Sequence, residues 1–100
     1  MDKEANDYHW KVLVTFLEQI ARQKGITQGQ IAEATGMKQS SISRLFSLNY
    51  VPKLHTFLSI AQAVGVNFFF EDKEGTSDLT KGFEAAMEKL GRRPDKLPQN

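Results

Sequence analysis

Apolar residues recur at helical spacing along much of this 100-residue chain. The first such pattern predicts a helix over residues 5–24 that stops at Gly25. Its buried stripe is expected to comprise Leu13, Leu17, Ile20 and Ala21, flanked by Trp10 and Phe16. Further patterns predict helices over residues 28–35, 39–46, 55–64 and 78–90. The core side of the fourth is expected to hold Leu54, Phe57, Leu58 and Ala61.

The sequence pattern changes after Gly65. Residues 66–71 form a short, aromatic segment that is prone to form a β-strand. Residues 72–75 then read as a turn before the last predicted helix, whose apolar face holds Leu79, Phe83, Ala86, Met87 and Leu90. A single strand cannot satisfy its own backbone hydrogen bonds. We therefore expect this strand to pair with its copy across a two-fold dimer axis. The alternative is an apolar coil that plugs the helical bundle.

Two short helical patterns meet at Gly36, within the stretch ITQGQIAEATGMKQSSISRL that runs from Ile26 to Leu45. Ala32 keeps the first helix thin where the second crosses it, and Gly36 adopts the positive φ of a tight turn without a Cβ penalty. The apolar contacts between the two helices are assigned to Ile31, Met37, Ile42 and Leu45. This spacing is the helix-turn-helix pattern, which favours a DNA-reading module.

Local signals refine the ends of these two helices. Thr27 followed by Gln30 is a capping-box arrangement, whereas Lys38 is a poor N-cap for the second helix. In the loop after that helix, Asn49 tolerates left-handed geometry and Pro52 keeps Val51 extended.

Charge is distributed unevenly, although the formal net charge is only +1. No Asp or Glu occurs from Ala34 to Phe70, while Lys38, Arg44 and Lys53 lie in that span. One basic face around the second short helix is therefore expected, and chance is the competing explanation. The chain has no cysteine, no apolar run of membrane-spanning length and a polar start unlike a secretory signal. These features fit a cytoplasmic protein that does not engage a membrane.

Residues 20–70 resemble the phage-repressor type of helix-turn-helix domain, the XRE or lambda-repressor-like family. The matching segments are KGITQGQIAEATGM, KQSSISRLF and PKLHTFLSIAQAVGV, in order and at the right distances. The resemblance implies a mainly α bundle of four to five helices that binds operator DNA, usually as a dimer. With the C-terminal strand and final helix added, we expect a DNA-binding domain over residues 1–65 and a strand-helix extension with a polar tail over residues 66–100.

Two positions depart from the family pattern. An Arg late in the first helix is often paired with a Glu at the end of the third, but Ala21 and Phe46 stand here. An apolar pair can replace a buried ion pair without loss of stability. The family also often has Gly where this chain has Leu48, which leaves the path of the following loop open.

The resemblance places Gln39, Ser40 and Arg44 against DNA bases. Ser43, one helical turn after Gln39 and Ser40, is also a candidate for base contact. Gln bonds adenine bidentately and Arg bonds guanine, so the chemistry agrees. Phosphate contacts are expected from Thr27, Gln28, Lys38, Asn49, Tyr50 and Lys53. The competing interpretations are a solvated helix surface for the serines and Gln39, solubility for Lys38 and Lys53, and a phosphate clamp for Arg44.

The predicted function is a sequence-specific DNA-binding transcription regulator, a repressor that reads a palindromic operator as a homodimer. The dimer or partner surface is assigned to Val66, Phe68, Phe69 and Phe70. The alternative is an antitoxin-type interaction module whose C-terminal part binds a toxin while the protein represses its own operon. His9 and His55 lack partners at metal-ligand spacing, and no enzyme motif is present, so neither a cofactor nor catalysis is expected.

Overall fold

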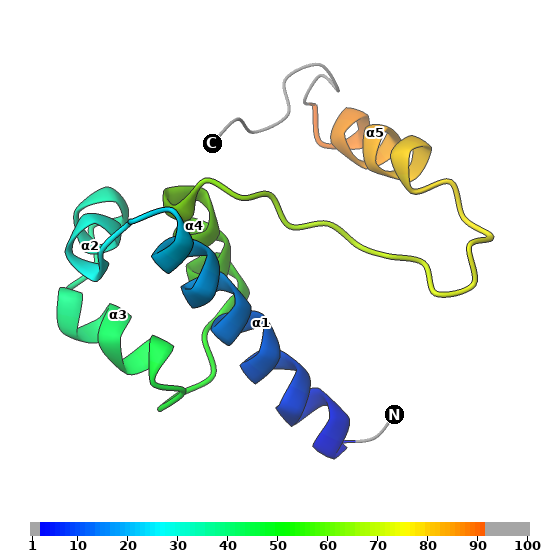
Figure 1. Ribbon diagram of the computed structural model, residues 1–100. Coiled ribbons are helices and arrows are strands. Elements are labelled where there is room, and N and C mark those ends of the chain that lie inside the picture. Colours follow the sequence, from blue (N-terminus) through cyan, green and yellow to red (C-terminus); the bar gives the residue numbers. More distant parts are fainter. Residues whose placement is uncertain (1–2, 92–100) are drawn as a thin grey trace. The chain divides into compact units, whose positions relative to one another are not determined.

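The computed structural model describes residues 3–91 and consists of five helices joined by short turns and one long extended segment. They are α1 (Lys3–Gln23), α2 (Gln28–Thr35), α3 (Gln39–Phe46), α4 (Leu54–Val64) and α5 (Leu79–Lys89). The chain divides into two compact units at the junction of Val66 and Asn67. Helices α1 to α4 form unit 1, and the segment from Asn67 through α5 forms unit 2 (Figure 1).

The predicted helices are confirmed. Both short helices of the helix-turn-helix begin and end where the sequence predicted, and the other three agree within two residues. Gly36 follows α2 at φ 74°, in the left-handed region that glycine adopts without a Cβ clash. The mainly helical class and the bundle of four helices in unit 1 are therefore correct.

The predicted C-terminal strand is wrong, because no strand occurs within residues 3–91. Residues 66–72 instead run as a coil without regular structure, visible in Figure 1 as the long stretch after α4. Aromatic composition gives this segment its β propensity, but a strand also needs a neighbouring strand to receive its backbone hydrogen bonds. Every other regular element of the described chain is a helix, so no such neighbour is present.

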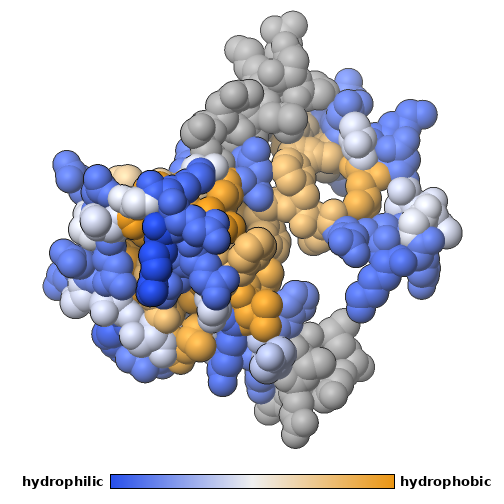
Figure 2. Space-filling view, viewed as in Figure 1, coloured by the Kyte–Doolittle hydropathy of each residue, from blue (hydrophilic) through white to orange (hydrophobic). Residues whose placement is uncertain are grey.

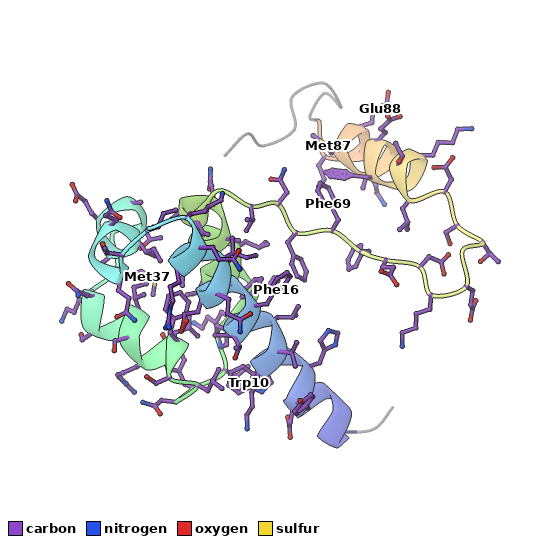
Figure 3. The ribbon with its side chains drawn as sticks, in the orientation of Figure 1. Trp10, Phe16, Met37, Phe69, Met87 and Glu88 are labelled. Carbon is purple, nitrogen blue, oxygen red and sulfur yellow. The ribbon has the colours of Figure 1, made fainter. Side chains whose placement is uncertain are left out.

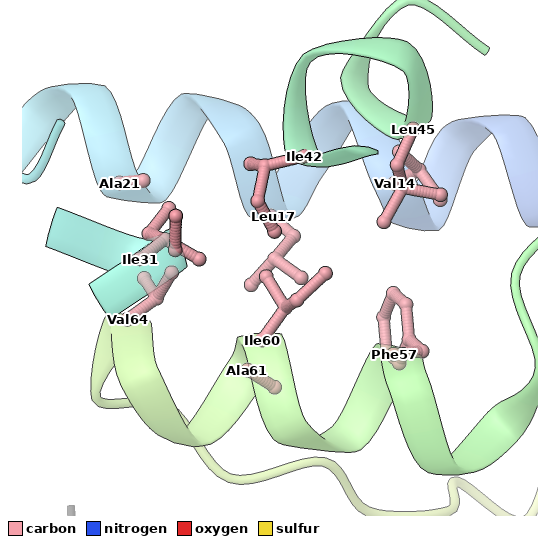
Figure 4. Packing of buried hydrophobic residues seen from close by; sticks show 11 residues of the cluster. Val14, Leu17, Ala21, Ile31, Ile42, Leu45, Phe57, Ile60, Ala61 and Val64 are labelled. Atoms are coloured by element: carbon pink, nitrogen blue, oxygen red, sulfur yellow. The ribbon is translucent and has the colours of Figure 1, made fainter. Parts of the chain in front are cut away.

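The core of unit 1 lies where its four helices converge. Figure 4 shows Ile31 of α2 and Ile42 of α3 directed toward α1 and α4. The side chains that are almost completely inaccessible to solvent are Ile31, Ile42, Leu45, Ile60, Val14 and Val64. Because α2 and α3 each contribute to the same apolar cluster, the helix-turn-helix is built into the bundle.

On two helices, some of the residues buried in the core differ from those predicted. On α1, Val14 is buried whereas Leu13 is only half-buried and Phe16 is exposed. On α4, Leu54 and Leu58 are exposed, and their places in the core are taken by Ile60 and Val64. Both stripes contain more apolar residues than one helix face can bury, so the sequence pattern left the centre of each stripe undetermined.

An unpredicted contact fastens the end of α1 to the end of α4. The Lys24 ammonium donates hydrogen bonds to the carbonyl oxygens of Val64, at 2.9 Å, and Gly65, at 3.0 Å. These carbonyls have lost their intrahelical partners at the helix C-terminus, where a positive charge is also favoured. Lys24 thereby helps hold the bundle closed where unit 1 ends.

Unit 2 has a small apolar core among its described residues. The rings of Phe69 and Phe83 pack with their centroids 5.5 Å apart, and Met87 is the one buried hydrophobic side chain among the described residues of this unit (Figure 3). The side chain of Asp78 accepts a hydrogen bond from the backbone amide of Lys81 and so caps α5. A unit of this size with so small a core falls below the range in which domains are usually stable alone.

The turn before α5 is organised around Asp72. Hydrogen bonds from the Ser77 side chain, and then from the backbone amides of Glu74 and Ser77, lower the pKa of the Asp72 carboxyl from 3.8 to about 2. Hydrogen bonding to the ionised form is the cause, since the carboxylate can only accept. The order of the turn therefore depends on ionised Asp72.

We expect the turn over residues 72–77 to lose its order in acid. Because the folded-state pKa is depressed, the contribution of Asp72 is complete above 3.8 and is lost as the pH falls through about 2. The backbone amide resonances of Glu74 and Ser77 in an NMR titration should report this transition. In the Asp72→Asn variant those resonances should no longer follow that transition, and a wild-type midpoint near 3.8 would contradict the assignment.

Candidate DNA-binding surface

Helix α2 begins with a complete capping box. The backbone amide of Thr27 donates to the Gln30 side chain at 2.8 Å, and the amide of Gln30 donates to the Thr27 hydroxyl at 3.1 Å. The sequence predicted this arrangement, and it is confirmed. It fixes where α2 starts, and a helix N-terminus of this kind favours anions.

The turn between α2 and α3 sets their relative orientation. Ala32 is buried at the crossing, and Met37 packs against the core from within the turn (Figure 3). The Thr35 hydroxyl donates to the carbonyl of Ile31 at 2.8 Å and accepts from the amide of Met37 at 3.3 Å. These contacts fix the position of the turn against α2 and so set the direction in which α3 begins.

Helix α3 has one buried face and one exposed face. Ile42 and Leu45 are fully buried, so the opposite side of the helix is held outward. The four residues predicted to touch bases are all exposed, namely Gln39, Ser40, Ser43 and Arg44. Lys38 precedes the helix without forming a side-chain cap, in agreement with the sequence. Polar side chains predominate over this side of unit 1 in Figure 2.

Gln39 lies against the start of α2. A Cβ atom built on Gly29 would lie 3.5 Å from the Gln39 side-chain oxygen and 3.8 Å from the Thr27 hydroxyl. These are ordinary van der Waals separations, so the absence of a side chain at Gly29 leaves a small recess that the Gln39 carboxamide borders. This contact was not predictable from the sequence, because glycine inside a helix usually indicates only lower helix propensity. The beginnings of α2 and α3 are thus neighbours.

Arg44 and Tyr50 also lie together. The Arg44 guanidinium carbon is 5.6 Å from the centroid of the Tyr50 ring, within the range of a cation–π interaction. The Tyr50 hydroxyl donates to the Ser41 carbonyl at 3.3 Å. Sequence reasoning assigned Tyr50 to phosphate contact and missed its packing on α3, since the return of the loop toward the helix was not predicted.

The loop after α3 turns at Leu48. Its φ is 63°, so Leu48 occupies the left-handed region, whereas Asn49, which was predicted to tolerate that geometry, does not adopt it. Leu48 stands where the family often has glycine, and its side chain packs against the core. Packing thus holds a backbone conformation that costs leucine roughly 1–2 kcal/mol. At the other departure, Ala21 is buried and Phe46 packs against the same core, so apolar residues occupy both positions of the family's ion pair.

The residues predicted to contact phosphate differ in their exposure to solvent. Thr27, Lys38, Asn49 and Lys53 are exposed, while Gln28 is half-buried. Thr27 and Gln28 adjoin Gly29 beside Gln39, and the backbone amide of Asn49 donates to the carbonyl of Arg44 at 3.1 Å. Lys53 is the N-cap residue of α4 and makes no side-chain cap bond. No carboxylate lies between Ala34 and Phe70, so negative charge is confined to other parts of the chain.

The residues assigned to a dimer or partner surface are divided between the two units. Val66 packs against the core of unit 1. Phe68, Phe69 and Phe70 are exposed to different degrees and line a groove of about 760 Å³ within unit 2. Leu79, Phe83 and Ala86 of α5 form its other apolar wall, and Asp78 and Glu84 also line it. Exposed apolar surface of this kind is typical of interaction sites.

Residues 3–91 hold no group of three or more His, Cys, Asp or Glu side chains suited to bind a metal ion. None of the helices in that part of the chain combines the length and apolar character needed to cross a bilayer.

Comparison with known proteins agrees with this geometry. A family model described as helix-turn-helix matches residues 17–70, from the middle of α1 to the aromatic segment after α4. No significant match was found among curated proteins or among solved structures. The match covers more than half of the chain and includes the capping box, the Gly36 turn and α3. The chain belongs to the XRE, or lambda-repressor-like, helix-turn-helix family of DNA-binding transcription regulators.

Proposed function

We propose that this protein is a sequence-specific repressor that binds a palindromic operator as a homodimer. The observation that carries the proposal is the two-sided character of α3, with Ile42 and Leu45 fully buried and Gln39 and Arg44 exposed. A helix held this way presents hydrogen-bonding side chains to base edges when it enters the major groove. A bound dimer then occludes the promoter DNA that it covers.

Specificity and affinity would be divided between two sets of residues. Base edges are assigned to Gln39, Ser40, Ser43 and Arg44, because their side chains can donate or accept hydrogen bonds in the groove. Phosphates are assigned to Thr27, Gln28, Lys38, Asn49 and Lys53, which fix register without reading sequence. Tyr50 was also predicted to contact phosphate, but its hydroxyl donates to the Ser41 carbonyl and its ring packs on Arg44, so it is not assigned to this set. The N-terminal amides of α2 support the phosphate role, since a helix N-terminus attracts anions.

Dimerisation is assigned to the aromatic groove of unit 2, and Val66 is not part of that assignment because it packs against the core of unit 1. Phe70 is 87% exposed and Phe69 is 58% exposed, so burial of this groove against a second copy would remove much apolar surface from water. Two copies related by a two-fold axis would match the two halves of a palindrome.

The test is an in vitro selection of DNA from a random pool, followed by footprinting of the selected sequence. We expect a palindrome whose half-sites are about 34–36 Å apart, one helical turn of DNA. Binding should weaken steeply with added salt, because Lys and Arg displace counterions from phosphates. Selection of no sequence, or protection of a single half-site by a monomer, would contradict the proposal.

The dimer has a separate test in Phe70→Asp, which adds one negative charge to the exposed groove. Light scattering should give twice the chain mass for the wild type and the single chain mass for the variant. Lys73→Gln changes the net charge by the same amount outside the groove lining and should leave the dimer intact. A monomeric wild type that co-purifies with a small protein encoded beside it would favour the antitoxin alternative, with this same groove as the binding site.

A further inference from the structure

Tyr50 touches helix α3 at two points. Its ring lies under the Arg44 guanidinium, with 5.6 Å between the guanidinium carbon and the ring centroid. Its hydroxyl donates to the Ser41 carbonyl at 3.3 Å, one turn earlier on the same helix. The ring is half-buried and Arg44 is exposed, so the tyrosine lies between the helix surface and the charged group.

The loop geometry explains how Tyr50 reaches that position. Backbone amides of Ser47, Leu48 and Asn49 donate to the carbonyls of Ser43, Leu45 and Arg44, so the chain folds back tightly onto the end of α3. Leu48 makes the reversal at φ 63° and packs against the core. A non-glycine residue stays in this conformation only when its surroundings hold it there. The position of Tyr50 is thus fixed by the fold.

An arginine on an exposed helix face samples many rotamers, and ordering it on a base costs conformational entropy. The Tyr50 ring reduces that cost in advance, because a guanidinium is attracted to the face of an aromatic ring. The ring carries no charge and adds nothing to the attraction between the protein and phosphates. Its effect on DNA binding therefore acts through Arg44.

We propose that Tyr50 is a positioning residue that sets sequence specificity by holding Arg44 in the orientation that reads its base pair. This inference rests on the proposed function, since it requires Arg44 to read a base. It differs from a phosphate contact by Tyr50, which would strengthen binding to every sequence alike.

The test compares Tyr50→Leu with Tyr50→Phe, each with and without Arg44→Ala, on DNA selected by the wild type. Tyr50→Leu removes the ring and should lower affinity for that DNA by roughly 2- to 5-fold, the range of a cation–π interaction at an exposed site. The lost preference should fall at the base pair affected by Arg44→Ala, with non-specific binding unchanged. Tyr50→Phe keeps the ring and should keep the preference.

In the Arg44→Ala background, Tyr50→Leu should have no further effect on the affinity. An equal loss in both backgrounds would overturn the proposal, because Tyr50 would then act without Arg44. A loss of non-specific binding in Tyr50→Phe would also overturn it and assign the hydroxyl to phosphate. Circular dichroism at the assay temperature confirms that every variant compared is folded.

A DNA-free measurement separates this inference from the proposed function. The δ-proton resonances of Arg44 should be shifted upfield by the ring in the wild type and in Tyr50→Phe, and should return to ordinary values in Tyr50→Leu. Resonances that do not respond to loss of the ring would overturn the positioning role. A different result is that the resonances respond as expected but the wild type selects no DNA sequence. The proposed function and the specificity role of Tyr50 would then both be wrong, whereas the packing of Arg44 on Tyr50 would be confirmed.

Discussion

Replacing Arg44 with alanine is expected to lower affinity for the selected operator by about 5- to 150-fold, and replacing Gln39 should do the same. A bidentate side-chain contact to a base discriminates by roughly 1–3 kcal/mol, which converts to that range. Both side chains are exposed on a helix whose opposite face is buried, so their removal should leave the fold intact. Quantitative binding to the operator and to scrambled DNA measures the effect.

Matched controls separate base reading from loss of charge. Arg22→Ala removes one positive charge from α1, where Arg22 pairs with Glu18 at 2.8 Å, and it should leave operator preference unchanged. Gln62→Ala on the exposed side of α4 is the equivalent control for Gln39. If Arg44→Ala weakens binding to all sequences equally and reduces the salt slope by about 1, Arg44 is a phosphate clamp. Wild-type preference in both variants would contradict the assignment of α3 as the reading helix.

Ile42→Ala is expected to destabilise unit 1 by roughly 2–5 kcal/mol, as truncations of fully buried Ile commonly do. Ile42 is fully buried and belongs to the cluster in which all four helices of the unit meet (Figure 4). The melting temperature should fall by roughly 10–30 °C in a domain of this size. The same side chain anchors α3, so the loss of stability should come from the helix that is proposed to read DNA.

Fluorescence of Trp10 measures this effect within the correct unit. Trp10 is the only tryptophan of the chain, and it packs half-buried against the core of unit 1. Ile42→Val removes one methylene and should cost only about 0.5–1.5 kcal/mol. Ser43→Ala, on the exposed side of the same helix, should be nearly neutral. A melting temperature unchanged by Ile42→Ala would show that α3 does not pack as described.

Much of unit 1 was predictable because its local signals agree with one another. The Thr27 capping box, the Gly36 turn and the apolar spacing around Ile42 each specify the same pair of helices. The strand after α4 was mispredicted because the aromatic residues favour β structure locally, whereas a strand requires a partner that sequence propensity does not reveal. The left-handed backbone conformation of Leu48 was likewise not predicted, because a leucine adopts it only where packing against distant residues stabilises it.

In the candidate site, too, some features were predictable from the sequence and others were not. Exposure of Gln39 and Arg44 followed from helical periodicity, because Ile42 and Leu45 identify the buried face. The neighbours of these side chains did not follow. Gly29 belongs to α2, whereas Gln39 is the first residue of α3. Tyr50 contacts Arg44 only because the chain reverses direction at Leu48. Such contacts join segments whose separation in space is fixed by tertiary packing.

The recess at Gly29 has a consequence for engineering altered regulators. A methyl group fits there, since its nearest neighbour would be 3.5 Å away, but longer side chains would compete with Gln39 for the same volume. Under the proposal that Gln39 reads a base, residues 29 and 39 should therefore be varied together to obtain regulators with new operators. Libraries that randomise only α3 would omit the combinations that include residue 29.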